Sequence, residues 1–145
     1  MTERRPLFHL LLHSADLLEA ELTRRLKPLG LGPRQARLID GLAHMGEVSQ
    51  AHLARAFKVT QASMSTMTSR LIAGGYIARR PDPQDTRGNL LSLTDKGRGL
   101  LAEIDAVWTS MDAYGAKALG VNRFKALAQE AGALRDALGG TRPGE

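Results

Sequence analysis

Two short stretches of this 145-residue sequence carry the polar side chains with the most distinctive chemistry. The stretch QASMSTMTSRLIA, residues 61–73, contains hydroxyl and amide side chains, one cation and no carboxylate. Short uncharged donors and acceptors can approach phosphates and base edges closely, whereas a carboxylate would be repelled there. The stretch PDPQDTRGN, residues 81–89, places Arg87 two residues after Asp85 among turn-forming residues. Both stretches indicate recognition of a polyanion.

The distribution of charge along the chain supports this interpretation. The formal net charge is +5, and the segment from Arg55 to Arg98 holds eight basic and three acidic residues. Residues 1–54 hold seven basic and six acidic residues, and residues 99–145 hold five and six. A basic middle third between nearly neutral flanks suits a module that binds nucleic acid. The alternative is a solvated basic surface that only keeps the protein in solution.

Other kinds of chemistry lack the residues that they need. The sequence has no Cys, which excludes disulfides, thiolate metal ligands and cysteine nucleophiles. We find no glycine-rich phosphate loop and neither the HExxH nor the GxSxG catalytic motif. His9 and His13 have the spacing of two metal ligands on a helix, but the sequence offers no evident third ligand. We therefore expect neither an enzyme nor a metal or cofactor site.

The apolar run near the N-terminus does not predict a membrane span. It extends only from Leu7 to Leu12, far short of the roughly 20 residues that a bilayer requires. It also leads into an acidic amphipathic stretch without a site that resembles a signal-peptide cleavage site. We expect a soluble cytoplasmic protein that does not engage a membrane.

The spacing of apolar residues predicts a mainly α chain with one small β-hairpin. Glycine and proline positions divide the chain, and Gly74-Gly75 are expected to end the fourth helix. Ser49, Thr60, Thr94-Asp95 and Asn122 stand where N-caps are expected. The expected helices span residues 6–28, 33–45, 49–57, 61–73, 94–118 and 122–138, and the expected strands span 76–80 and 89–93.

Two short helices joined by a tight turn at residues 58–60 form the arrangement of a helix-turn-helix. A hairpin directly after the second helix is then a wing, and an arginine at its tip can enter a minor groove of DNA. Asp85 would either hold the side chain of Arg87 or accept hydrogen bonds from backbone N–H groups of the turn. A plain turn with a solvated arginine is the alternative.

The segment Val59–Gly97 resembles the recognition helix and wing of the MarR (multiple antibiotic resistance regulator) family of transcription factors. The most specific features are Asp85 and Arg87 in the wing and the sequence LTDKG, residues 93–97, which opens the next helix. The resemblance covers nearly the whole chain. It implies a winged helix-turn-helix with N- and C-terminal dimerisation helices. Residues 1–145 would form one subunit, with a DNA-binding lobe at 33–97 and dimerisation helices at 6–28 and 98–138.

The resemblance also implies a function and a set of site residues. Family members are homodimers that usually repress transcription from a pseudo-palindromic double-stranded operator, and many release DNA when a small aromatic or phenolic effector binds. We expect the DNA contacts among Arg55, Lys58, Thr60, Gln61, Ser63, Ser65, Thr66, Ser69, Arg70, Arg79, Arg80, Asp85 and Arg87. We expect an effector pocket, if present, among His9, His13, Trp108 and Met111.

One departure from the family concerns the recognition helix. Family members often carry an additional basic residue midway along it, where this sequence has Thr66 and leaves Arg70 as the only cation of the helix. A winged-helix module for protein–protein interaction, without DNA readout, is the alternative function. The acid-free helix and the local excess of positive charge argue against it.

Overall fold

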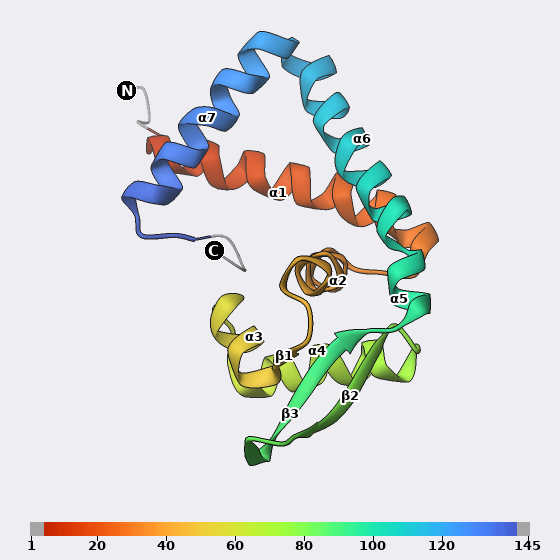
Figure 1. The fold of residues 1–145 in the computed structure, drawn as a ribbon. Helices are drawn as coiled ribbons and strands as arrows, with labels where there is room; N and C mark the ends of the chain where they lie inside the picture. The colour runs from red at the N-terminus through yellow and green to blue at the C-terminus, as the bar shows by residue number, and fades with distance from the viewer. Residues whose placement is uncertain (1–4, 142–145) are drawn as a thin grey trace.

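The computed structural model describes residues 5–141, and its elements follow the predicted order with three additions (Figure 1). The elements are α1 (Leu7–Leu26), the 3₁₀ helix η1 (Lys27–Leu29), α2 (Pro33–Met45), β1 (Val48–Ser49), α3 (Gln50–Ala56), α4 (Gln61–Ala73), β2 (Ile77–Asp82), β3 (Asp85–Leu93), α5 (Asp95–Gly99), α6 (Leu101–Leu119) and α7 (Val121–Ala137). The additions are η1 at the end of the first helix, α5 as a separate helix before α6, and β1, whose two residues are too few to produce a pattern in the sequence.

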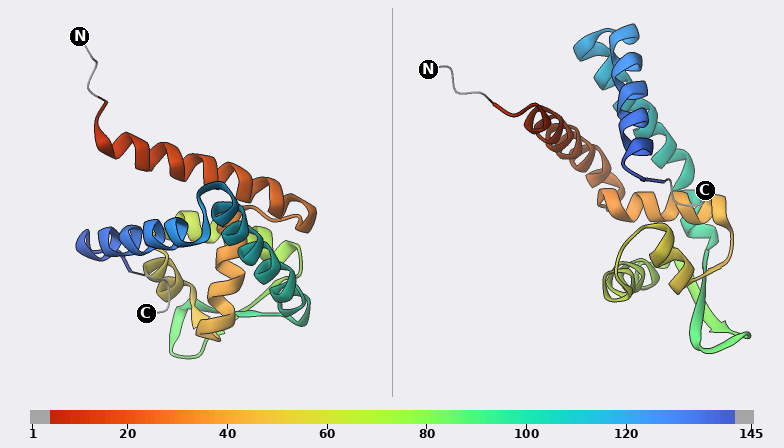
Figure 2. Two further views of the ribbon diagram at one scale, coloured as in Figure 1. Left: turned by 90° about the horizontal axis from the view of Figure 1, so that it is seen from above. Right: turned by 90° about the vertical axis from the view of Figure 1, so that its left-hand side faces the viewer.

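The molecule has two parts that share α2 as their boundary. In Figure 1 the sheet, α3 and α4 form a lower lobe, while α1, α6 and α7 form the upper part. Helices α6 and α7 meet at an apex and diverge from it, and α1 crosses below that apex, as the two views in Figure 2 also show. Gly120 makes the reversal between α6 and α7 with a φ of +95°, a backbone conformation that suits glycine.

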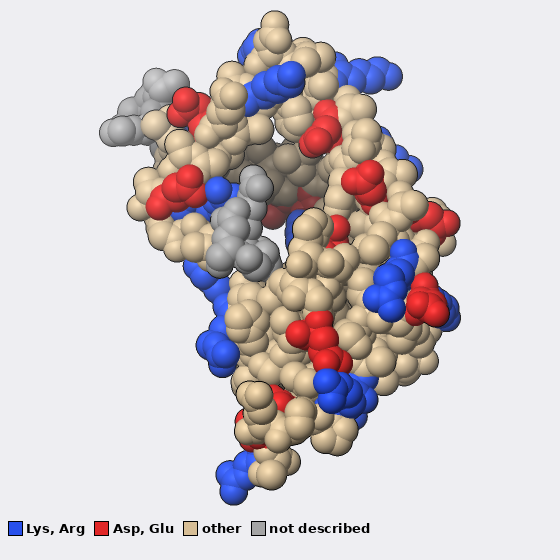
Figure 3. Space-filling view, viewed as in Figure 1, with Lys and Arg blue, Asp and Glu red and all other residues tan. Residues whose placement is uncertain are grey.

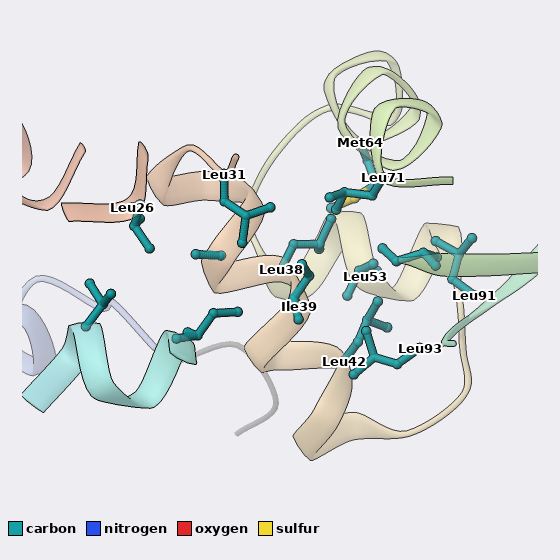
Figure 4. Packing of buried hydrophobic residues seen from close by; sticks show 14 of the residues in the cluster. Leu26, Leu31, Leu38, Ile39, Leu42, Leu53, Met64, Leu71, Leu91 and Leu93 are labelled. Atoms are coloured by element: carbon teal, nitrogen blue, oxygen red, sulfur yellow. The ribbon is translucent and has the colours of Figure 1, made fainter. Parts of the chain in front are cut away.

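One apolar core holds the lower lobe together and extends into the upper part. Leu38, Ile39 and Leu42 of α2 lie at its centre and are at most 2% exposed (Figure 4). The core also contains Leu53, Met64, Leu71, Ile77, Leu91 and Leu93 from the surrounding helices and strands, and it continues to Leu22, Leu26, Ile104 and Val107. Burial of each large side chain contributes about 1.5–3 kcal/mol, so this shared core fixes how α1 and α6 meet the lobe.

The small sheet is antiparallel with the strand order β1-β3-β2. Ile77 pairs with Leu93 and Arg79 pairs with Leu91, which confirms the predicted hairpin. The strands are longer than expected, because β3 already begins at Asp85 and only Pro83 and Gln84 remain as the turn. The predicted loop of eight residues was therefore too long.

Most predicted caps are confirmed by hydrogen bonds. Ser49 accepts from the backbone N–H of His52 at 3.1 Å, and Thr60 accepts from that of Ser63 at 3.0 Å. The prediction for Asn122 was wrong, because α7 begins at Val121 directly after Gly120 and has no side-chain cap.

Helix ends also differ from the predictions at three other places. The expected helix 94–118 is two helices, since the Leu100 N–H bonds to the Gly97 carbonyl three residues back and tightens the turn there. Pro6 precedes α1 as its N-cap instead of occupying the first helical position. After α4, only Gly75 adopts a positive φ, at +81°, while Gly74 stays helical.

Most of α1 is exposed, and only Leu22 and Leu26 near its C-terminal end are buried. Leu7, Leu10 and Leu17 are each more than 60% exposed, although they have the spacing of an apolar helix face. Nothing in residues 5–141 covers them. No helix in this range has the length and apolar character to cross a membrane.

An ion cluster links the C-terminal end of α1 to α6. The Glu21 carboxylate accepts hydrogen bonds from Arg24 and, at 2.8 Å, from Arg25. Arg25 also donates to the Ser110 carbonyl at 3.2 Å and lies 5.2 Å from the ring centre of Tyr114. The two guanidinium groups lower the pKa of Glu21 from 4.5 to about 2.

This pKa shift predicts an acid-sensitive contribution to stability. Since the folded state lowers the pKa of Glu21, the contribution is complete above about pH 4.5 and disappears as the pH falls towards about 2. Between these limits the thermal midpoint of the parent should fall more steeply than that of Glu21→Gln. The exposed Glu103 of α6 supplies a control, and Glu103→Gln should keep the parent's steepness. Equal slopes for the parent and Glu21→Gln would contradict the assignment.

Candidate nucleic-acid interface

Helix α4 presents one face to the core and an acid-free face to solvent. Met64, Thr68 and Leu71 are buried and Met67 is half-buried. The opposite side, which we call the recognition face, is exposed and consists of Gln61, Ala62, Ser63, Ser65, Thr66, Ser69 and Arg70. The buried side fixes the rotation of the helix about its axis, so these short polar side chains point together into solvent.

The buried Thr68 was not predicted. A threonine in a Ser/Thr-rich helix gives no sequence signal that separates it from its exposed neighbours. Its hydroxyl donates to the Met64 carbonyl at 2.8 Å, so its burial leaves no polar group unsatisfied. On the recognition face, the Thr66 hydroxyl donates to the Ala62 carbonyl at 3.1 Å and keeps its oxygen lone pairs as acceptors.

The sheet register separates the two adjacent arginines of the wing. Side chains alternate between the faces of a strand, and Arg79 pairs with the buried Leu91. Arg79 therefore lies on the sheet face that packs on the lobe, beyond the buried Ile77. Arg80, paired with Leu90, lies on the opposite face. Arg87 lies beyond the register shift at Pro81 and Asp82, where the alternation no longer assigns a sheet face.

Arg80 is held by a carboxylate that sequence reasoning missed. Its Nη2 and Nε donate to the two Glu47 carboxylate oxygens at 2.6 and 3.0 Å, and these hydrogen bonds lower the pKa of Glu47. Glu47 precedes β1, and β3 lies between β1 and β2. Because β1 itself gave no sequence signal, nothing in the sequence could have placed Glu47 beside Arg80. The pair fastens β2 to the segment that precedes β1.

Two aspartates shape the tip of the wing through its backbone. Asp85 accepts from the Arg87 backbone N–H at 3.0 Å, and Asp82 accepts from that of Gln84 at 2.9 Å. Of the two predicted roles of Asp85, the structure therefore shows the turn-forming one. The Arg87 side chain is exposed and has no ion pair within residues 5–141. Figure 3 shows a basic side chain projecting from the lowest point of the molecule, where this tip lies.

Two further predicted cations, Arg55 on α3 and Lys58 in the turn before α4, have different surroundings. Arg55 is exposed on α3. Lys58 has a φ of +53°, in the left-handed region that non-glycine residues rarely adopt. Its ammonium donates to the Gly139 carbonyl at 3.3 Å, so it faces the end of α7 in this structure.

The four predicted effector residues separate into two pairs. Trp108 and Met111 line a pocket of about 400 Å³ between α1, α2 and α6, together with Leu18, Glu19, Leu22, Arg37, Asp40 and Asp112. His9 and His13 do not line this pocket and are exposed on the projecting half of α1. Residues 5–141 contain no cluster of three or more His, Cys, Asp or Glu residues that could hold a metal ion.

Comparisons with known proteins give a consistent result. The model of the MarR family matches residues 29–88. The HTH-type transcriptional repressor Rv2887 of Mycobacterium tuberculosis is 32% identical over 108 residues, which cover 74% of this chain and 78% of the relative.

Solved structures share the fold over almost the whole chain. A probable transcriptional regulator from Pseudomonas aeruginosa has a TM-score of 0.78 and 27% identity, and the match covers 88% of this chain and 96% of that one. A mutant MarR from E. coli complexed with operator DNA has a TM-score of 0.70 and 20% identity, with 87% and 93% covered. The lobe with its winged helix-turn-helix, the flanking helices and these matches together show that the chain belongs to the MarR family of transcriptional regulators.

Proposed function

We propose that this protein is a sequence-specific regulator that binds double-stranded DNA as a homodimer and represses transcription from a pseudo-palindromic operator. The observation that carries the proposal is the acid-free recognition face of α4 beside a wing whose Arg79 and Arg87 have no carboxylate partner among the described residues. The similarity to a curated repressor and to a MarR structure with operator DNA supports it.

In this proposal α4 enters the major groove, where short hydroxyl and amide groups reach base edges. Thr60 and Gln61 stand at the N-terminal end of α4, whose partial positive charge favours a phosphate. Arg87 would enter the neighbouring minor groove, whose negative potential attracts a guanidinium. The remaining predicted contacts, Arg55, Lys58, Arg70 and Arg79, would bind the backbone. Arg80 and Lys58 would first have to leave Glu47 and Gly139.

The proposed homodimer accounts for the exposed apolar side chains of the upper part. Leu7, Phe8, Leu10, Leu11 and Leu12 cover most of the circumference of the beginning of α1 and are each at least 50% exposed. An apolar surface this wide on a helix is normally packed against protein. Helix α7 adds Val121, Leu127, Leu134 and Leu138. A second copy would cover these surfaces through residues 6–28 and 98–138, leaving the lobe at 33–97 for DNA.

A small aromatic or phenolic effector would bind in the pocket that Trp108 and Met111 line. The pocket has apolar walls from α1 and α6, and the Trp108 ring suits a planar aromatic ligand. Its Arg37 guanidinium is paired with Glu19 at 3.2 Å and would have to leave this carboxylate to bind an anionic group of the ligand. Since these helices connect the upper part to the lobe, the ligand could favour a dimer geometry that no longer matches the operator half-sites.

A mobility-shift titration tests the proposed function. The probe is the intergenic DNA upstream of the protein's own gene, with excess non-specific competitor, in the presence and absence of a panel of aromatic carboxylates. We expect a retarded band that survives competition and that one compound removes. A band that no compound removes would contradict the proposed effector but not the proposed DNA binding. Absence of any band, also on duplexes selected from a random pool, would favour the interaction module.

Arg87→Ala tests the role of the wing tip. Loss of one minor-groove arginine should weaken operator binding by about 1–3 kcal/mol, which fluorescence anisotropy can measure as a change in Kd. The dimer mass from light scattering should not change, because the wing tip lies far from α1, α6 and α7 (Figure 1). Operator affinity equal to that of the parent would exclude Arg87 from the interface.

Arg79→Ala and Arg80→Ala form a matched pair of neighbouring charge deletions. Arg79 has no ion pair within residues 5–141 and lies on the sheet face that carries Ile77 and Leu91, whereas Arg80 is neutralised by Glu47. We therefore expect Arg79→Ala to raise the Kd for the operator more than Arg80→Ala at the same salt concentration. The reverse order would show that Arg80 leaves Glu47 to bind a phosphate.

A further inference from the structure

We propose that Thr94, Lys96 and Gly97 form a clamp that fixes the orientation of α4 relative to α6, and that Lys96 is a positioning residue for operator recognition. The proposal rests on the DNA-binding homodimer proposed above. In such a dimer, the spacing between the two recognition faces depends on how rigidly each α4 is attached to the helices that join the subunits.

Lys96 contacts the end of α4 directly. Its ammonium donates to the carbonyl of Gly74, the C-cap residue of α4, at 2.7 Å. The same ammonium lies 4.6 Å from the ring centre of Tyr76, the residue before β2. A cation at a helix C-terminus satisfies a free carbonyl and interacts favourably with the helix dipole. The side chain therefore joins the beginning of α5 to the end of α4.

Thr94 makes a second connection between the same two helices. Its hydroxyl donates to the Gly75 carbonyl at 2.6 Å and accepts from the Gly97 N–H at 3.1 Å. Its backbone N–H donates to the Tyr76 carbonyl at 3.1 Å. One residue thus caps α5 and holds the two residues that follow the cap of α4.

Gly97 allows the two segments to approach this closely. It is buried, and a Cβ atom at this position would overlap with the Tyr76 carbonyl oxygen. The obstacle is backbone, which cannot rotate away as a flexible side chain could. The sequence LTDKG therefore has a mechanical reason for its glycine beyond opening a helix.

The hydrogen bonds of the clamp connect the end of α4 to α5, and so to α6, without passing through the two strands of the wing. Helix α5 ends at Gly99, and the Ile104 N–H bonds to the Leu100 carbonyl at 2.9 Å at the beginning of α6. A rotation of α6 would therefore move α5, and the clamp would carry that movement to the end of α4. Without the clamp, α4 would depend on its core contacts alone, and we expect its orientation relative to α6 to vary more.

A distance measurement tests the clamp without DNA. The chain has no Cys, so Ser69→Cys on the exposed face of α4 accepts one nitroxide label per subunit. Pulsed electron paramagnetic resonance then gives the distance distribution between the two α4 helices of a dimer. We expect Lys96→Met to broaden this distribution and Lys96→Arg to retain the parent's width. Arg98→Met removes an equal charge from α5, where Arg98 faces Asp95 at 3.5 Å, and should leave the width unchanged.

Operator spacing gives a second readout that simple loss of folded protein would not change. The probes are a duplex selected by the parent from a random pool and versions with one base pair added or removed between half-sites. We expect Lys96→Met to bind the selected duplex on the order of tenfold more weakly, as for loss of one charge-assisted hydrogen bond, and to discriminate less between spacings.

The outcomes separate the clamp from the proposed function. The clamp would be overturned if Lys96→Met changed neither the distance distribution nor the ratio of affinities for duplexes with different half-site spacings. It would also be overturned if Arg98→Met had the same effect as Lys96→Met. If the parent bound no duplex at all, the proposed function would fail, and the distance measurement would still decide whether Lys96 fixes α4 within the dimer.

Discussion

Burial of Met64 and Leu71 of α4 and of Leu91 of β3 in one apolar core is the constraint on which the candidate interface depends (Figure 4). These side chains are at most 1% exposed, and they come from the recognition helix and the wing. Their burial sets the rotation of α4 and thus which side chains form the recognition face. The register of β2 and β3 then places Arg79 on the same sheet face as Leu91. The buried side of α4 therefore determines which polar side chains its recognition face presents to solvent.

Three carboxylates near this interface bind an arginine or backbone N–H groups of the wing. Glu47 neutralises Arg80. Asp85 and Asp82 bind backbone N–H groups at the wing tip. The positive charge that remains available is smaller than the composition suggests, because Lys58 also faces a carbonyl of the upper part. The interface thus depends more on the short side chains of α4 and on few unpaired arginines than on a broad basic surface.

Local patterns predicted those features that depend on neighbouring residues. The helix-turn-helix, the caps Ser49, Thr60 and Thr94, and the hairpin all followed from short-range spacing, and they are confirmed. Features that depend on distant segments could not be predicted. Glu47 meets Arg80 only because β1 joins the sheet, and Lys58 meets Gly139 only because α7 returns to the lobe. The division of the expected helix 94–118 at Leu100 was missed, although Gly97 and Gly99 just before it are poor helix formers.

The salt dependence of duplex binding tests the central claim, that α4 and the wing form a DNA-binding surface, most directly. A protein that neutralises several phosphates releases their counterions, so the logarithm of the association constant should fall linearly with the logarithm of salt concentration. The expected slope is about −0.9 per phosphate contact, so several contacts give a steep decline. A flat dependence, or no duplex binding at low salt, would contradict the account and favour a winged-helix module that binds protein.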